Sequence, residues 1–328
     1  MSNKNINIIF FGNTDFSNPT LLACNNSFNL KAVVTNKSKK MGRGQKILDT
    51  PVMTLAKEEN LKIIEGVDLN DASFIDQLKD LNPDFFVVVA YRILPKSLLG
   101  IPKYGSINIH SSLLPKYRGA APIQHALLNQ EDSTGVSTFL IEPKVDTGKI
   151  IDQLKIEITK DDNYGSLSKK LSEAGADLIE SSINKCLHHS SELIEQDNSM
   201  ATLAPKISKD DLKINWSDKS DTILAKVRAF SPTPGAFTTI NSKRLKIFKA
   251  ESINNDNNHE IGSIYHVDKN FFDVQCGQNA LRLHNVQLEG KKAMDSKDFI
   301  VGYQDLGSNI LIWKIYLKIY QFFLSLAW

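Results

Sequence analysis

Short apolar runs alternate with candidate helices through the first half of the chain, and this alternation limits the folds open to it. The runs have the length and β-branched or aromatic composition of buried strands: 6–11, 30–35, 85–90, 106–109 and 136–141. The candidate helices between them cover 20–24, 51–59, 71–81 and 121–129. This order predicts a parallel sheet covered by helices on both faces. A strand at 149–158 and a long helix at 164–188 complete the predicted domain.

The pattern changes after about residue 190. Residues 191–208 are predominantly polar and are interrupted by Pro205, so they are predicted to be a linker. A helical stretch at 221–229 then leads into segments typical of short strands: 235–240, 244–250, 262–267, 271–276 and 280–288. Such a series predicts a small β-barrel. The expected organisation is a first domain at 1–190, the linker at 191–208, a second domain at 209–307 and an apolar tail at 308–328.

Composition is typical of a globular protein of two domains. The 328 residues are 41% hydrophobic and 23% charged, and the net charge of +2 predicts that any basic surface is local. Three widely spaced cysteines, Cys24, Cys186 and Cys276, indicate neither a disulfide framework nor a zinc site. No metal site is predicted. Because the first residues contain no apolar signal segment, a cytoplasmic location is expected.

Candidate catalytic residues lie at the end of one predicted strand and in a turn further on. Asn108 and His110 are two residues apart in the run 106–110 and therefore point to the same side of a strand. Asp146 belongs to an Asp-Thr-Gly sequence. Each feature has a structural alternative, since a lone strand histidine is commonly structural and Asp-Thr-Gly is commonly a turn. Together, an amide, an imidazole and a carboxylate suit acyl transfer, and ligands of such sheets bind beyond the carboxyl ends of strands.

The continuous block 108–124, Asn-Ile-His-Ser-Ser-Leu-Leu-Pro-Lys-Tyr-Arg-Gly-Ala-Ala-Pro-Ile-Gln, resembles the folate-dependent formyltransferase family, and within it the branch that formylates methionyl-tRNA. The resemblance runs from about residue 5 to about residue 307. It departs at Gly12-Asn13-Thr14, where the family usually has Gly-Thr-Pro. The resemblance implies a Rossmann-like catalytic domain followed by an OB-like barrel that helps to bind tRNA.

The resemblance also implies the reaction and its residues. The formyl group of 10-formyltetrahydrofolate, the co-substrate, is expected to pass directly to the α-amine of methionyl-tRNA, with the initiator tRNA as the substrate for translation initiation. Asn108, His110 and Asp146 are the expected catalytic residues, and whether His110 or Asp146 takes the amine proton stays open. The expected folate-binding segment is Ser112, Leu113, Leu114 and Pro115. The alternative for both leucines is an ordinary core position.

Local basic segments are the expected tRNA-binding residues. The loop at 36–46 has several basic residues and no acidic one, and the resemblance implies that it contacts the tRNA acceptor end through Lys39, Lys40 and Arg43. A second group lies in the barrel, where basic side chains would bind phosphates: Arg228, Lys243, Arg244 and Lys246. Lys206 in the linker is a further candidate by its position in the family. No protein partner is expected.

Three alternatives stay open from the sequence. A glycinamide ribonucleotide formyltransferase shares the catalytic set but lacks the second domain and the basic loop, and a sugar-nucleotide formyltransferase has a related second domain. A non-enzymatic RNA-binding module would leave Asn108, His110 and Asp146 unexplained. The nearly apolar segment 310–328 lies outside the resemblance. Its two lysines on one predicted helical face suit an interfacial helix better than a membrane span, and its role is open.

Overall fold

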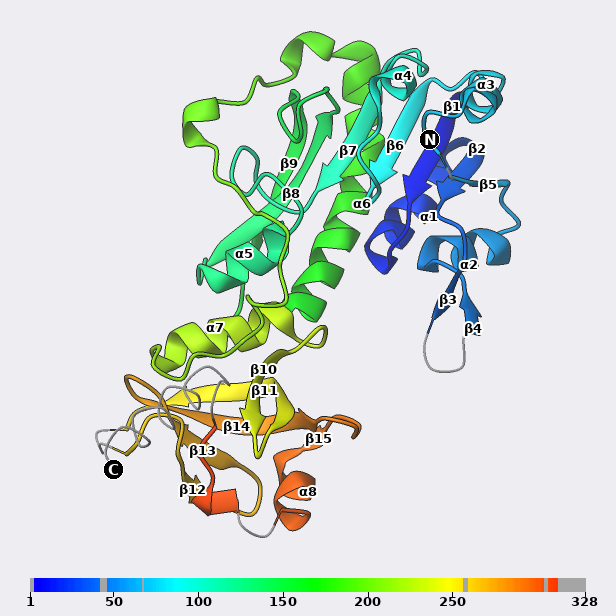
Figure 1. The fold of residues 1–328 in the computed structure, drawn as a ribbon. Coiled ribbons are helices and arrows are strands. Elements are labelled where there is room, and N and C mark those ends of the chain that lie inside the picture. The colour runs from blue at the N-terminus through cyan, green and yellow to red at the C-terminus, as the bar shows by residue number, and fades with distance from the viewer. Residues whose placement is uncertain (1–2, 42–45, 67, 256–258, 304–305, 312–328) are drawn as a thin grey trace, which may run out of the picture. The chain divides into compact units, whose positions relative to one another are not determined.

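The structure, a computed structural model, describes residues 3–41, 46–66, 68–255, 259–303 and 306–311. The chain forms two compact units (Figure 1). The first comprises Met1–Pro122, Asp132–Ile158 and Leu167–Pro205, and the second comprises Ile123–Glu131, Thr159–Ser166 and Lys206–Trp328. The domain boundaries at 190 and 208 stay a prediction.

A seven-stranded sheet forms the centre of the first unit, in the order β5-β2-β1-β6-β7-β8-β9. The strands are β1 (Asn3–Gly12), β2 (Phe28–Thr35), β5 (Ile63–Glu65), β6 (Phe85–Val89), β7 (Ser106–His110), β8 (Ser133–Leu140) and β9 (Ile150–Glu157). From β5 to β7 all neighbours pair in parallel, as predicted. The last two strands, β8 and β9, pair antiparallel. An alternation of strands and helices does not specify this reversal, and β8 and β9 are joined by a turn that contains no helix.

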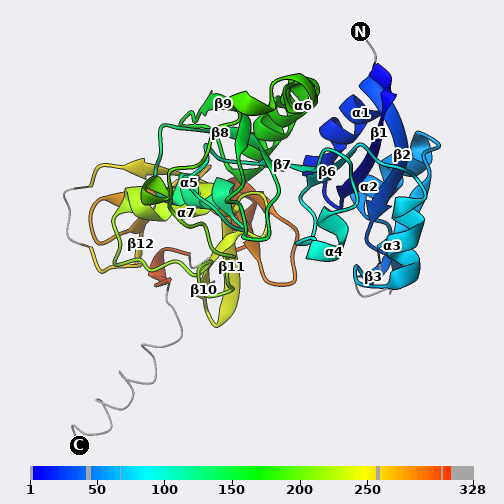
Figure 2. The same cartoon turned by 90° about the horizontal axis from the view of Figure 1, so that it is seen from above.

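Helices cover both faces of this sheet (Figures 1 and 2). They are α1 (Asn18–Ser27), α2 (Pro51–Glu58), α3 (Ala72–Lys79), α4 (Lys96–Leu99) and α6 (Tyr164–His188). Helices α1 and α6 lie on one face, and α3 and α4 lie on the other. On the second face, Phe11, Phe86 and Val88 pack with Leu78 and Leu98 in one buried cluster. Every residue of β6 is buried, which explains its continuous apolar sequence.

The first unit also contains a short hairpin that the sequence did not predict. Its strands β3 (Lys39–Met41) and β4 (Lys46–Leu48) pair antiparallel and enclose residues 42–45, which lie outside the described residues. Three-residue strands are too short for an apolar periodicity to reveal.

The second unit is built on an antiparallel sheet in the order β10-β11-β14-β13-β12, with β15 paired to β14. The strands are β10 (Ala236–Ile240), β11 (Lys243–Ile253), β12 (Ile264–Val267), β13 (Phe272–Gln275), β14 (Ala280–Leu288) and β15 (Met294–Asp295). The helices are α7 (Ser220–Phe230), α8 (Ser296–Val301) and nearly all of α5 (Pro122–Leu128). Strand β10 alternates buried and half-buried residues, as expected for a sheet with one covered face. The predicted fold class is confirmed.

Four short 3-10 helices complete the secondary structure of the described residues: Asp15–Ser17, Ser190–Glu192, Asn198–Met200 and Leu306–Ser308. At the end of the second unit, Leu311 donates its backbone N–H to Gly262, and Ile264 donates to Asn309. The rest of the predicted apolar tail, 312–328, lies outside the described residues. Within the residues that are described, no helix is both long and apolar enough to cross a membrane.

The segment 191–205, predicted as a linker, lies along the first unit. Ile194 pairs with Ile150 of β9, and Leu203 pairs with Arg118. Thr202 receives the Arg118 backbone N–H in a hydrogen bond of 2.9 Å. The contacts with Arg118 place the segment beside the loop that follows β7, the strand that carries Asn108 and His110.

Candidate active site

Two antiparallel neighbours, β7 and β8, bring polar and apolar side chains together on one face of the first sheet. Asn108 pairs with Phe139, and His110 pairs with Ser137. Paired residues of neighbouring strands point to the same face. Alternation along β7 places Ile107 and Ile109 on the opposite face, where a Cβ added to Gly175 of α6 would lie 2.7 Å from the Ile109 side chain.

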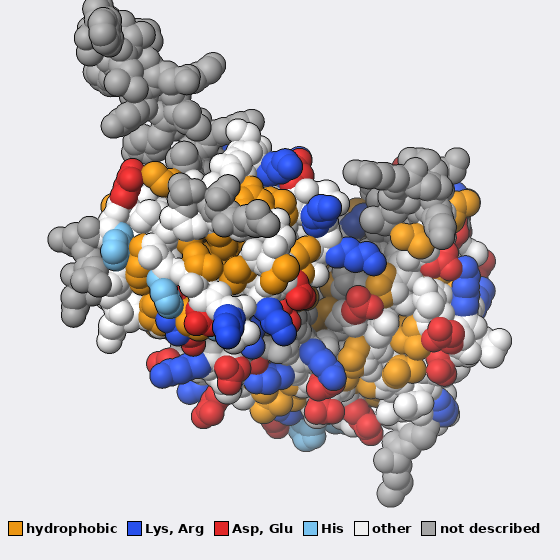
Figure 3. All heavy atoms as spheres, turned by 90° about the horizontal axis from the view of Figure 1, so that it is seen from below, with side chains coloured by type: hydrophobic (Ala, Val, Ile, Leu, Met, Phe, Trp, Pro, Cys, Tyr) orange, Lys and Arg blue, Asp and Glu red, His pale blue; other side chains and the backbone are white. Residues whose placement is uncertain are grey.

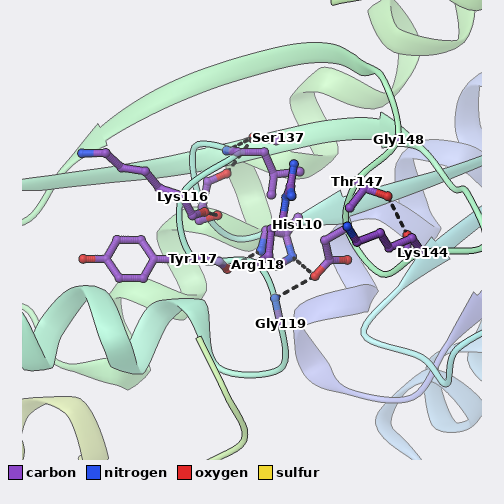
Figure 4. Close-up of polar contacts among 12 residues, drawn as sticks. His110, Lys116, Tyr117, Arg118, Gly119, Ser137, Lys144, Thr147 and Gly148 are labelled. Atoms are coloured by element: carbon purple, nitrogen blue, oxygen red, sulfur yellow. Dashed lines mark hydrogen bonds and ion pairs between the residues drawn. The ribbon is translucent and has the colours of Figure 1, made fainter. Parts of the chain in front are cut away.

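His110 is held by a backbone carbonyl on one side and faces a carboxylate on the other (Figure 4). Its side chain is 7% exposed. Its Nε2 lies 2.8 Å from the Tyr117 carbonyl oxygen, which can only accept, so Nε2 carries a proton. Its Nδ1 lies 3.8 Å from Oδ2 of Asp146. Nδ1 is therefore the ring nitrogen that faces Asp146.

Asp146 lies in the turn between β8 and β9 with a backbone φ of 53°. This left-handed conformation is uncommon for a residue with a side chain, although aspartate adopts it more readily than most. Oδ2 of Asp146 accepts the Gly119 backbone N–H at 2.8 Å. Gly119 itself has φ +125°, and a Cβ there would lie 2.6 Å from the Ala204 carbonyl oxygen. A glycine is therefore required at the position that holds the carboxylate.

Asn108 differs from His110 and Asp146 in the hydrogen bonding of its side chain within the described residues. The residue is half-buried, and its side-chain amide makes no hydrogen bond to any part of the chain that the structure describes. A half-buried amide with free donors can bind an oxygen atom of a ligand.

The segment expected to bind folate is fixed by two polar residues of the neighbouring strands. The Leu114 backbone N–H donates to Oγ of Ser137 at 3.0 Å, and the Leu114 carbonyl accepts from Gln153 at 2.9 Å. Oγ of Ser112 donates to the Lys116 carbonyl at 2.6 Å. Ser137 and Gln153 were not among the residues singled out from sequence, because neither belongs to the motif that drew attention to the segment.

The two leucines of this segment have different surroundings. Leu114 is buried and packs with Phe139 and Ile150, as the core alternative for these residues requires. Leu113 and Pro115 are half-buried. The segment therefore combines buried Leu114 with two partly accessible apolar side chains, those of Leu113 and Pro115.

The expected tRNA-binding residues are distributed over both units. Arg43 lies outside the described residues, and the backbone of Lys39 and Lys40 belongs to β3. The side chains of Lys206, Lys243 and Arg244 are exposed. Figure 3 shows one face of the molecule, on which Lys and Arg side chains are interspersed with Asp and Glu.

Two of the expected basic residues make structural contacts in the second unit. Nε and Nη2 of Arg228 donate to the carbonyls of Asp162 and Thr159, at 2.7 and 2.6 Å. Partial burial lowers the pKa of Arg228 from its ordinary value. Nζ of Lys246 donates to the Pro234 carbonyl at 2.7 Å. Arg228 and Lys246 therefore use their basic groups in hydrogen bonds to backbone carbonyls.

Family models match both units. The formyl transferase model matches residues 4–183, and the model of the formyl transferase C-terminal domain matches residues 206–304. The chain belongs to the formyl transferase family.

The curated relatives narrow this family. A protein of Geobacter metallireducens is 38% identical over 90% of this chain and 96% of its own length, and one of Porphyromonas gingivalis is 36% identical over 95% and 100%. A protein of Thermodesulfovibrio yellowstonii is 42% identical over 90% and 95%. All three are named methionyl-tRNA formyltransferase. Within the formyl transferases, the chain therefore groups with these enzymes.

Solved structures share the fold at lower identity. HypX from Aquifex aeolicus in complex with tetrahydrofolic acid has a TM-score of 0.63 at 14% identity, over 91% of this chain and 47% of HypX. WlaRD, a sugar 3N-formyl transferase, has a TM-score of 0.61 at 23% identity, over 88% of this chain and 99% of its own. The fold therefore recurs in proteins of different names.

Proposed function

We propose that this chain transfers the formyl group of 10-formyltetrahydrofolate to the α-amine of methionyl-tRNA. The observation that carries the proposal is the approach of His110 and Asp146 to 3.8 Å, on the sheet face that also presents Asn108. The match to methionyl-tRNA formyltransferases along nearly their whole length supports this acceptor over other amines. We further propose that the initiator tRNA is the physiological acceptor.

The reaction needs a polarised carbonyl and a route for protons. The α-amine attacks the formyl carbon, a new C–N bond forms, and the bond from that carbon to N10 of the folate breaks. The amine loses a proton and N10 gains one. Since a free α-amine has a pKa of about 7.7–8.0, an appreciable fraction is neutral and nucleophilic near neutral pH. No nucleophilic serine or cysteine is required.

Asn108 is proposed to stabilise the charge that develops on the formyl oxygen. Its amide is half-buried and has no hydrogen-bond partner among the described residues, so it is free to donate to that oxygen. A donor placed in this way typically contributes about 3 to 4 kcal/mol to transition-state stabilisation.

His110 and Asp146 are proposed to handle the proton together. Because Nε2 of His110 is committed to the Tyr117 carbonyl, any proton that the ring exchanges passes through Nδ1. That atom faces Asp146, whose carboxylate would stabilise a charged ring. The proton from the amine therefore comes to lie between Nδ1 and Oδ2 before it reaches N10.

The surface beside these residues suits the folate. Leu113 and Pro115 offer apolar area for a flat ring, and Leu114 between them is packed in the core. The hydrogen bonds from Ser137 and Gln153 fix the Leu114 backbone before any ligand binds. We propose Ser112–Pro115 as the folate-binding segment, in which Ser112 and Leu114 act through the position of the backbone.

The exposed basic side chains are proposed to bind tRNA phosphates. Lys206, Lys243 and Arg244 are accessible, and Lys39, Lys40 and Arg43 are included by the position of their loop in the family. Lys246 and Arg228 are included as well, with Arg228 contributing mainly through its support of the backbone at Thr159 and Asp162. Contacts of this kind would make affinity fall with salt.

A direct assay separates this function from its alternatives. The protein is incubated with 10-formyltetrahydrofolate that carries a labelled formyl group, and with methionyl-tRNA, glycinamide ribonucleotide or an aminosugar nucleotide. We expect label to appear on methionyl-tRNA, and faster on the initiator than on the elongator species. Transfer only to one of the small acceptors would refute the proposal.

A further inference from the structure

A buried amide contacts both the turn that carries Asp146 and a buried guanidinium. Nε2 of Gln196 donates to the Asp146 carbonyl at 3.0 Å and to the Gly148 carbonyl at 2.8 Å. Oε1 of Gln196 accepts from Nε of Arg118 at 3.1 Å and from Nη2 at 2.7 Å. Both side chains are 8% exposed. The two N–H donors and the oxygen of this amide are thus all used inside the protein.

Arg118 is an unusual partner for an amide in a buried position. Among the described residues it forms no ion pair with a carboxylate, and its Nη1 donates to Oδ1 of Asn198 at 2.9 Å. A buried guanidinium is costly unless its donors find acceptors, and here amide oxygens accept a hydrogen bond from each of its three nitrogens. Gln196 is therefore oriented by Arg118, because only the oxygen end of its amide can face the guanidinium.

The turn needs such support. Asp146 adopts φ 53°, and residues other than glycine remain in this conformation where surrounding contacts impose it. The Gly119 N–H holds the Asp146 carboxylate from one side, and the Gln196 amide holds the Asp146 carbonyl from the other. Gly119 follows Arg118 directly in the chain, and Arg118 holds Gln196. The contacts of Gly119 and Gln196 with Asp146 therefore both depend on residues 118–119.

We infer that Gln196 and Arg118 are positioning residues for the proposed formyl transfer: they hold the Asp146 turn so that the carboxylate faces Nδ1 of His110. This inference rests on the proposed function and assigns a role to two residues outside the motif. Neither residue touches the reacting atoms. Loss of their contacts should lower kcat and leave folate affinity nearly unchanged.

Two substitutions of Gln196 separate positioning from simple stability. Gln196→Met removes all four hydrogen bonds at similar volume. Gln196→Glu keeps the acceptor for Arg118, as a charge-assisted pair, and removes the N–H groups that reach Asp146 and Gly148. We expect both variants to lower kcat by about 10- to 100-fold with a KM for the folate within about twofold, the order expected when a catalytic group shifts by about 1 Å. Glu195→Gln is the matched control, because Glu195 is the exposed neighbour and forms an ion pair with Lys149 at 2.9 Å.

A double-mutant cycle tests whether the effect passes through Asp146. Single-turnover rates are compared for Gln196→Glu, Asp146→Ala and the combined variant. If Gln196 acts by holding Asp146, its substitution should cost little once the carboxylate is gone. Fully additive losses, or wild-type kcat in Gln196→Glu, would overturn the inference.

Hydrogen–deuterium exchange gives a readout that does not depend on the reaction. The Gly119 N–H is bonded to the Asp146 carboxylate, so a displaced turn should expose it. We expect faster exchange of the peptide containing Gly119 in both Gln196 variants and no change in Glu195→Gln. Unchanged exchange in all variants would refute the positioning role. Absence of formyl transfer to methionyl-tRNA by the unmodified protein would instead refute the proposed function.

Discussion

Asn108 and His110 lie two residues apart on β7 and have very different surroundings. The His110 ring is almost fully buried and contacts Tyr117 and Asp146, whereas the Asn108 amide has no bonded partner among the described residues. A buried side chain with satisfied contacts fits a group whose orientation matters. A half-buried amide with free donors fits one that binds the substrate itself.

The role of Asn108 leads to a kinetic prediction. Asn108→Ala should lower kcat by about 100-fold or more, because one donor to the developing oxyanion is lost. The fold should be unaffected, since no intramolecular hydrogen bond of the Asn108 side chain is recorded among the described residues. Steady-state kinetics together with circular dichroism provide the measurement.

Asn26→Ala is the matched control for that experiment, because Asn26 is an exposed asparagine on α1. It should turn over like the unmodified protein. If Asn108→Ala were equally active, the proposed donor would have to be another group.

Sequence pointed to the candidate-site residues with distinctive side chains, and it gave no sign of the groups that contact them through the backbone or from a distant segment. Asn108 and His110 were predicted from strand alternation, and Asp146 from its Asp-Thr-Gly sequence together with the resemblance. The Tyr117 carbonyl leaves no trace in residue type, and the glycine at 119 does not by itself show that its N–H reaches a carboxylate. Gln196 lies in a polar segment, where a buried glutamine looks the same as a solvated one.

At the scale of helices and strands, α6 packs against β7 through a position without a side chain. A Cβ at Gly175 would lie 2.7 Å from Cγ2 of Ile109, the residue before His110. The close approach of the helix backbone therefore leaves no room for a side chain at this position between α6 and β7.

Gly175→Ala tests this contact. The substitution gains about 1 kcal/mol of helix propensity but forces a β-branched side chain to shift, at a cost of about 1 to 3 kcal/mol. We expect a net decrease in Tm together with a lower kcat, since Ile109 and His110 are adjacent. Differential scanning fluorimetry and kinetics provide the two readouts.

Asp177→Ala on the same helix serves as the control, because Asp177 is exposed. Its Tm should be unchanged or slightly higher, as expected from helix propensity. A Tm increase of the same size in Gly175→Ala would mean that Ile109 adjusts freely, contrary to the packing argument.

Long periodic helices and strands marked by an apolar run were predictable, whereas short elements without such a run were not. The helix predicted at 164–188 coincides with α6, and the apolar runs of the first half overlap the central strands. Strands β3 and β4 and helices α4 and α8 each have at most six residues, which is too few for a period to emerge. Strand direction at β8 and β9 depends on how the chain returns, which composition does not encode.

Across the whole molecule, each unit contains at least one buried thiol. Cys24 and Cys186 belong to the first unit, and Cys276 belongs to the second. Burial raises the pKa of Cys186 and Cys276 to about 12 and raises that of Cys24 as well. Because these pKa values lie above the ordinary one, the reactive thiolate is scarce until the pH becomes strongly alkaline.

These thiols should report the opening of each unit separately. At about pH 8 we expect iodoacetamide to modify all of them very slowly in the native protein and rapidly in guanidinium chloride. Mass spectrometry of the labelled peptides gives a rate for each cysteine. Rapid native labelling of any of the three would contradict its burial.

The contact between Gln196 and the Asp146 carbonyl joins residues 50 positions apart in the chain. During synthesis on a ribosome, the last strand of the first sheet, which ends at Glu157, emerges well before Gln196 does. The nascent protein can therefore pair all the strands of its first sheet while the turn beside His110 still lacks the contact with Gln196. The protein therefore becomes catalytically competent only after the sheet that carries the site has formed.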